Sequence, residues 1–247
     1  MSHCVGAYTP FYRWLIFFGL LLFGGFFALS NDLLAELLGS DESYLSGVIL
    51  FLFVLTSLDA GRRAHHLGSE LCSAADIAAR AREGEQLFVT AVGSGVGYAQ
   101  DNVPDSYAHH HLLLLANKTY QQGALCNQDL LLERLENALG RGHETGWFLA
   151  DLMIRLGLLG TVIGFIFMLS SVAQVSSVDI HALQQLLTNM STGMRIALYT
   201  TLTGLTSGML LGFQYRLLDQ AVDRLMAEII ELSEVHITAQ LRQLTAA

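Results

Sequence analysis

Charged residues are scarce in this chain, and two long stretches contain none at all. Asp, Glu, Lys and Arg make up 14% of its 247 residues, against roughly 25% in a soluble globular domain. Residues 156–178 and 196–215 lack these four residue types and also His, and about 20 apolar residues suffice to cross the hydrocarbon core of a bilayer. The composition excludes an ordinary soluble domain and predicts a membrane protein.

Cysteine is nearly absent, and acidic residues outnumber basic ones. Cys4, Cys72 and Cys126 are widely separated and form no CxxC pair, so they indicate neither a disulfide framework nor a zinc site, and we expect reduced thiols. The formal net charge of −9 leaves no basic stripe for nucleic acid. We therefore expect no nucleic-acid partner and no metal, and we also expect neither a cofactor nor enzymatic activity.

Four apolar segments predict four transmembrane helices in two hairpins: residues 14–31, 43–58, 156–178 and 196–215. Basic residues beside these segments indicate their orientation, because Lys and Arg are enriched on the cytoplasmic side. These residues are Arg13, Arg62, Arg63, Arg155 and Arg216. Both termini and the segment between the hairpins are therefore predicted to be cytoplasmic. An alternative for the first segment is a cleaved signal peptide, since Arg13, an apolar run and Ala28-Leu29-Ser30 follow one another.

The predicted fold is an all-α membrane protein of four parts. These are an N-terminal transmembrane hairpin (1–61), a cytoplasmic helical segment (62–146), a second transmembrane hairpin (147–216) and a cytoplasmic C-terminal helix (217–247). The glycine-rich run at 93–97 predicts a turn, because it lacks the flanking strand and helix of a nucleotide-binding loop. Tyr44 and Tyr215 stand at the ends of spans, as interfacial aromatic residues do. Past Tyr215, apolar residues recur every three or four positions, so the last helix is predicted to continue.

Small and hydroxylated residues form a stripe on each of the last two spans. On the third span the stripe consists of Gly157, Thr161, Gly164, Met168 and Ser171. On the fourth span it consists of Ala197, Thr201, Gly204 and Gly208, beside a run of Thr200, Gly204, Gly208 and Gly212 at every fourth position. Such runs let another backbone come close. Taken alone, they are also explained by ordinary packing, with each threonine bonded to a carbonyl one turn back.

Two motifs within these stripes resemble the third and fourth spans of the MotA/TolQ/ExbB family. They are Gly157-Leu-Leu-Gly160-Thr161-Val-Ile-Gly164 and Ala197-Leu-Tyr-Thr-Thr201-Leu-Thr-Gly204-Leu. The resemblance implies the A-type stator subunit of an ion-driven motor in the bacterial inner membrane. It implies a homopentamer around a dimer of a single-span B-type subunit that bears a membrane Asp.

The resemblance also implies roles for individual residues of the hairpin at 147–216, which it makes pore-lining. The residues expected along the ion pathway are Thr161 and Thr201, extended by Thr200 and Ser171. The residues expected to pack helices around the partner are Gly157, Gly160, Gly164, Ala197, Gly204 and Gly208. Arg195 is expected either to contact the partner or to extend its side chain to the membrane interface.

A physical argument from the residues points the same way. Proton transfer across lipid through a side chain needs a group that can change its charge, and none of the four spans contains one. We therefore expect a second chain to supply it. The chain departs from the family where Ile154 and Arg155 replace a usual proline and where Arg195 replaces an acidic residue. The alternatives are a small stand-alone permease or channel and a membrane scaffold; the machine driven, and proton against sodium, stay open.

Overall fold

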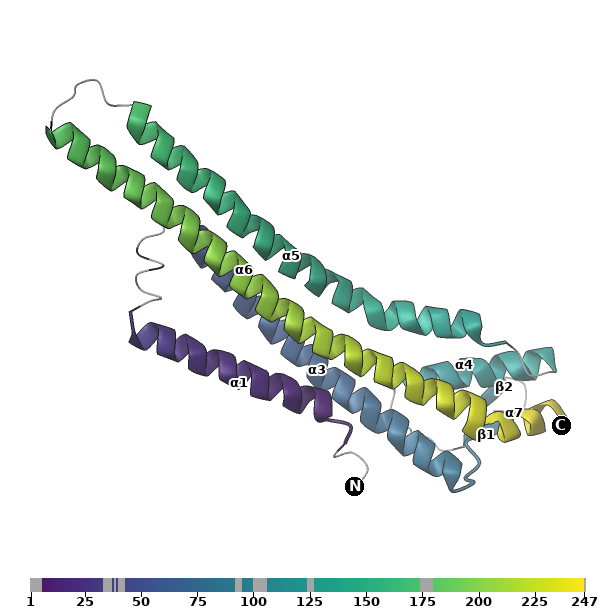
Figure 1. Ribbon diagram of the computed structural model, residues 1–247. Coiled ribbons are helices and arrows are strands. Elements are labelled where there is room, and N and C mark those ends of the chain that lie inside the picture. Colours follow the sequence, from purple (N-terminus) through teal and green to yellow (C-terminus); the bar gives the residue numbers. More distant parts are fainter. Residues whose placement is uncertain are drawn as a thin grey trace. The chain divides into compact units, whose positions relative to one another are not determined.

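Long helices make up most of the chain. The computed structural model describes residues 6–32, 37, 39, 43–91, 95–99, 106–123, 127–173 and 180–246 (Figure 1). The elements run α1 (Thr9–Ser30), α3 (Leu45–Arg82), β1 (Phe88–Ala91), β2 (Gly95–Tyr98), α4 (Tyr107–Gln122), α5 (Asp129–Ala173), α6 (Ile180–Glu231), a π-helical turn (Leu232–His236) and α7 (Thr238–Ala246). Four of them, α1, α3, α5 and α6, are long and apolar enough to cross a membrane, which confirms the four predicted candidates.

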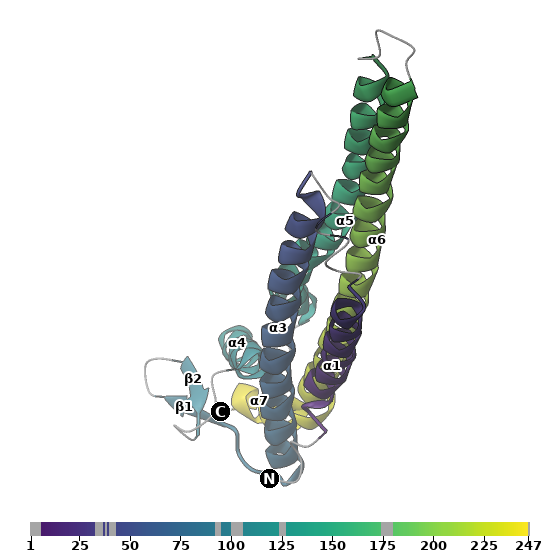
Figure 2. The same cartoon turned by 90° about the vertical axis from the view of Figure 1, so that its left-hand side faces the viewer.

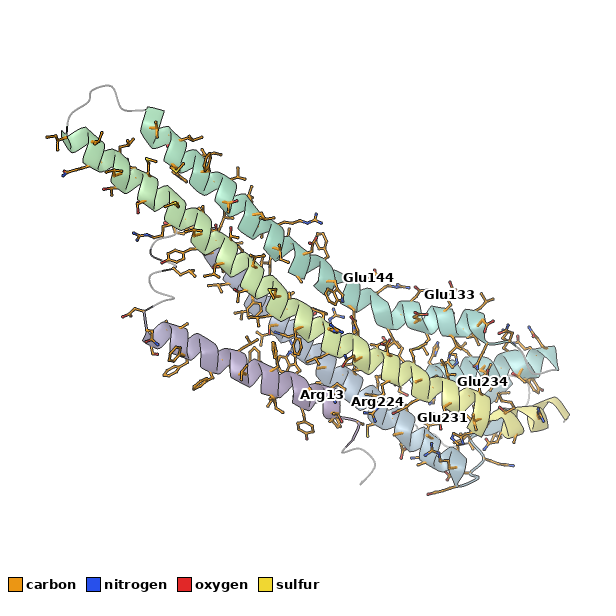
Figure 3. The ribbon with its side chains drawn as sticks, viewed as in Figure 1. Arg13, Glu133, Glu144, Arg224, Glu231 and Glu234 are labelled. Atoms are coloured by element: carbon orange, nitrogen blue, oxygen red, sulfur yellow. The ribbon has the colours of Figure 1, made fainter. Side chains whose placement is uncertain are left out.

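The chain divides into two compact units. The polar unit comprises Met1–Trp14, Gly61–His143 and Leu217–Ala247, and the apolar unit comprises Leu15–Ala60 and Glu144–Arg216. Charged side chains of the polar unit include Glu133 on α5 and Arg224 and Glu231 on α6 (Figure 3).

The apolar unit exposes large hydrophobic side chains over most of its helices. On α1, Ile16, Phe23 and Phe26 are each about 70% exposed, and the contact of the Phe17 ring with the Phe213 ring, at 4.8 Å between centroids, joins α1 to α6. A surface this apolar suits hydrocarbon rather than water. With 52 residues, α6 is about 78 Å long, so it continues well beyond a hydrocarbon core of about 30 Å.

Tyr215 corrects one expectation about the ends of the spans. Tyr44 is 80% exposed, as an interfacial aromatic residue can be, but Tyr215 is only 1% exposed. Its ring lies directly on the backbone of α5 at Gly146, where an added Cβ would overlap the ring. Tyr215 is therefore a core residue, because a glycine on the facing helix opens a place for it.

The polar unit contains a β-hairpin, so the expectation of an all-helical chain is wrong at this place. Strands β1 and β2 pair antiparallel, from Phe88 opposite Tyr98 to Ala91 opposite Gly95. Gly95 and Gly97, which were expected in a turn, belong to β2. Strand β2 alternates glycine with a larger residue at a period of two, and its glycines concealed the strand in the sequence.

Helix α4 holds the hairpin in place. The Val96 N–H donates to the Asn117 side chain at 2.9 Å, and the Asn117 amide donates back to the Val96 carbonyl at 3.1 Å. The Tyr98 ring stacks on the His109 ring with centroids 4.0 Å apart. Burial raises the pKa of the Tyr98 phenol and lowers the pKa of the His111 imidazole, because both groups lose water that would stabilise their charged forms.

The C-terminal part of α6 completes the polar unit. The helix does continue past Tyr215, to Glu231, and its stripe of Leu218, Leu225 and Ile229 is buried.

Cys72 takes part in a disulfide bond, so the expectation of a reduced thiol is wrong for this residue. Spacing along a chain does not show how far apart two cysteines are in space. Cys4 and Cys126 lie outside the described residues.

Gly146→Ala is expected to lower the stability of the protein by about 1–3 kcal/mol, because the new methyl group overlaps the fully buried Tyr215 ring. Gly140→Ala on the same helix is the matched control, since nothing lies within 4 Å of the added methyl group. Thermal unfolding of the purified protein in detergent measures both. Equal melting temperatures for the two variants would contradict the tight Tyr215 packing.

Stability is expected to fall as the pH drops below about 6.5, because the unfolded chain then binds a proton that buried His111 resists in the folded state. His111→Leu should make this decline shallower. His110→Leu changes an exposed neighbour that makes only the smallest contribution to this pKa shift, so it should alter the decline much less. Melting temperatures from pH 5 to 8 test the assignment, and identical pH profiles for the two variants would refute it.

Candidate functional site

Helices α5 and α6 lie side by side in the apolar unit (Figures 1 and 2), and their backbones touch where glycines face each other. A Cβ added at Gly204 would lie 2.7 Å from both the Gly157 Cα and the Met153 carbonyl oxygen. A Cβ added at Gly157 would lie 3.1 Å from the Gly204 Cα. No side chain larger than hydrogen fits at Gly204 without moving a helix, so this pair sets the separation of α5 and α6.

A second glycine pair lies about two turns further along α5. A Cβ at Gly164 would lie 2.5 Å from the Gly193 carbonyl oxygen, and a Cβ at Gly193 would lie 2.7 Å from the Gly164 carbonyl oxygen. Ala197 also contacts Gly164 here. Gly193 was missed in the sequence, although it stands four residues before Ala197 and extends the same run of small residues.

The remaining small residues of the two stripes complete this contact. Gly160 receives the side chain of Thr200, which is fully buried and whose hydroxyl donates to the Ile196 carbonyl at 2.8 Å. Gly208 lies against Ile154 and the Ala150 carbonyl. The glycines named in the sequence analysis thus pack α5 against α6 of one chain, and Thr200 lies inside that contact.

Two threonine hydroxyls lie at the border of the contact. The Thr201 hydroxyl donates across the helices to the Gly157 carbonyl at 3.1 Å, and the Thr161 hydroxyl donates to the Leu158 carbonyl at 2.6 Å. Both residues are half-buried. Each donor is engaged, but a hydroxyl oxygen also has two lone pairs, so both residues can accept a hydrogen bond from water or from a protonated carboxyl group.

Two expected site residues remain, Arg195 and Ser171. Arg195 lies exposed on α6, and Ser171 belongs to α5 with a side chain outside the described part.

A buried polar pair was missed in the sequence. The Ser57 hydroxyl on α3 donates to the Gln214 side-chain oxygen on α6 at 2.9 Å, and both residues are fully buried. The signal in the sequence was an amide inside an otherwise apolar stretch.

Each helix of the α5–α6 pair has a long uncharged stretch: residues 156–178 and 196–215 contain no Asp, Glu, Lys, Arg or His. The two stretches are staggered, because Gly157 packs on Gly204 and Gly164 packs on Gly193, which places Arg195 near the level of Gly164. Among the described residues, no group of three or more His, Cys, Asp or Glu could hold a metal ion. Such a pair can form a wall with fixed hydrogen-bond acceptors, but it cannot itself bind and release a proton near neutral pH.

These features define a class: a membrane protein whose last two apolar helices pack through glycines and contain long uncharged stretches. The sequence model of the MotA/TolQ/ExbB proton channel family matches residues 114–231, which include all of α6 and all of α5. The match confirms the resemblance predicted from the two motifs and indicates a proton channel-type membrane subunit. No curated protein and no solved structure matches the chain.

Gly204→Ala is expected to destabilise the protein by about 1–3 kcal/mol, because its methyl group meets backbone atoms that cannot rotate away. Gly212→Ala is the matched control two turns along α6: its methyl group meets only Trp147, at an ordinary 3.5 Å, so its effect should stay within about 0.5 kcal/mol. Thermal unfolding in detergent distinguishes them. A Gly204→Ala protein as stable as Gly212→Ala would show that the helices do not touch there.

Proposed function

We propose that this chain is the ion-conducting A-type subunit of a motor driven by the ion-motive force, and that its role is ion conduction rather than catalysis. Five copies surround two copies of a single-span B-type subunit, whose membrane helix bears an Asp. The bacterial inner membrane holds the assembly with both termini in the cytoplasm, a topology supported by the distribution of arginines around the four spans. The ion is most simply a proton, because the family is one of proton channels.

The observation that supports this proposal most strongly is that each helix of the α5–α6 wall contains a stretch of about bilayer length without Asp, Glu, Lys, Arg or His. Burying a carboxyl group in an apolar environment raises its pKa, because desolvation disfavours the charged form. A partner Asp facing the wall would therefore take up a proton there. Once neutral, it no longer carries the cost of a charge in hydrocarbon, and it can donate to the lone pairs of Thr161 and Thr201.

The rigid contact between α5 and α6 supports a stepwise motion. The glycine pairs keep the two helices at one separation, so the wall presents its threonines at a constant depth. Each protonation then lets the partner helix move from one copy of this chain to the next. The membrane potential contributes about 2.3 kcal/mol per charge for every 100 mV.

Subunit counting is the decisive experiment on the assembly. The chain should be purified together with a candidate B-type protein that has one apolar span and a membrane Asp, and native mass spectrometry should give five copies to two. A stable monomer or dimer that conducts ions in liposomes without any partner would replace the motor by the stand-alone channel. An assembly with a B-type partner that passes no ions would support the scaffold.

Thr201→Val should abolish ion flux through the assembled complex, because valine keeps the volume of threonine but removes the hydroxyl at the border of the wall. Thr203→Val is the matched control: Thr203 is buried, and its hydroxyl donates to the Tyr199 carbonyl of its own helix at 2.8 Å. The measurement is acidification of liposomes that contain the complex. Full flux in Thr201→Val would reduce Thr201 to a packing residue.

A further inference from the structure

A groove on the polar unit carries a concentration of positive charge. It has a volume of about 350 Å³, and it lies between α3, α5 and the start of α4. Arg62, Arg63 and His66 line it from α3, and His143 lines it from α5. No carboxylate is found among the described residues that line it, although the whole chain carries a net charge of −9. An anion is therefore the ligand class that this groove fits.

A glycine allows one of these arginines to reach its place. The Arg63 guanidinium lies directly against the backbone of α5 at Gly142, where an added Cβ would overlap it. Any other residue at position 142 would require the guanidinium to move. Arg62, next in the chain, is exposed and forms no ion pair with the described residues, so its charge is available to a ligand.

Two carboxylates lie beside the groove rather than in its wall. Asp219 is 2.6 Å from the Nδ1 atom of His143. Glu70 accepts a hydrogen bond from the Tyr107 N–H at 2.8 Å, and its other oxygen is 4.0 Å from the Nε2 atom of His66. These acids hold the two histidines in place and leave Arg62 as the exposed positive charge that faces the ligand.

The place of the arginines in the chain indicates the source of the anion. Arg62 follows the apolar segment 43–58 of the same helix by four residues, a rise of about 6 Å. In a helix that crosses the membrane, this distance puts the guanidinium groups at the level of the lipid headgroups. The planar guanidinium matches the geometry of a phosphate, and basic pockets beside membrane helices bind anionic headgroups.

We propose that this groove, formed by Arg62, Arg63, His66 and His143 over Gly142, binds the phosphate group of an anionic phospholipid. The proposal goes beyond ion conduction, because it assigns a lipid site to the polar unit and requires only that α3 spans the membrane. The bound lipid tethers α3 to α5 within this unit, since its phosphate contacts arginines of one helix and lies over the backbone of the other.

Retained lipid tests the proposal directly. The full chain is reconstituted in phosphatidylcholine nanodiscs with or without phosphatidylglycerol, and native mass spectrometry counts the phosphatidylglycerol that stays bound after transfer to detergent. Arg62→Gln should lower retention about fivefold. Gly142→Ala should lower it as well without changing any charge, because its methyl group displaces Arg63.

Arg141→Gln is the matched control, because it removes an exposed arginine of the same unit that does not line the groove. Its retention should equal that of the unaltered protein, and size-exclusion profiles should agree for all variants. Equal losses in Arg62→Gln and Arg141→Gln would reduce the effect to general charge attraction and overturn the site. In a second arm, inorganic phosphate or phosphatidylglycerol is added to lipid-free protein in detergent, and the melting temperature is measured. If phosphate raises the melting temperature as much as phosphatidylglycerol does, the ligand is free phosphate and the proposal of a lipid is overturned.

Discussion

The direct contact between the backbones of α5 and α6 is the constraint on which the proposed ion pathway depends. Gly157 meets Gly204 and Gly164 meets Gly193, so two helices approach more closely than side chains would permit. In a bilayer there is little hydrophobic drive between helices, and close packing is a main source of their association. The same contact brings the Thr201 hydroxyl within hydrogen-bond distance of the opposite helix, so the glycines place the polar groups as well.

Within the apolar unit, the uncharged stretches of helix still carry polar hydroxyl groups. Residues 156–178 and 196–215 carry no Asp, Glu, Lys, Arg or His, yet the helix pair carries hydroxyl oxygens with free acceptor capacity at its border. A charged residue in this wall would hold a partner carboxylate by a strong ion pair, whereas a hydroxyl holds it weakly. Weak, repeated sites suit a group that must leave as easily as it arrives.

The sequence predicted the helices well because hydrocarbon demands long uncharged segments, and it predicted the glycine stripes because close packing demands small residues at every fourth position. It did not predict which helix the glycines face, since a stripe carries no label for its partner. The β-hairpin was missed because Gly95 and Gly97 are usually breakers of regular structure. Burial of Tyr215 was missed because it depends on Gly146, a residue 69 positions away on another helix.

The hydrogen bond between Ser57 and Gln214 has a consequence for how α3 can move. An amide in an apolar core has few other groups to bond, and each unmade bond there costs free energy. Sliding α3 along α6 by one turn would carry Ser57 about 5 Å away and leave the Gln214 oxygen without its donor. This hydrogen bond fixes the axial register of the two helices. Bending or tilting them leaves the bond intact, so these motions cost less free energy than sliding one helix past the other.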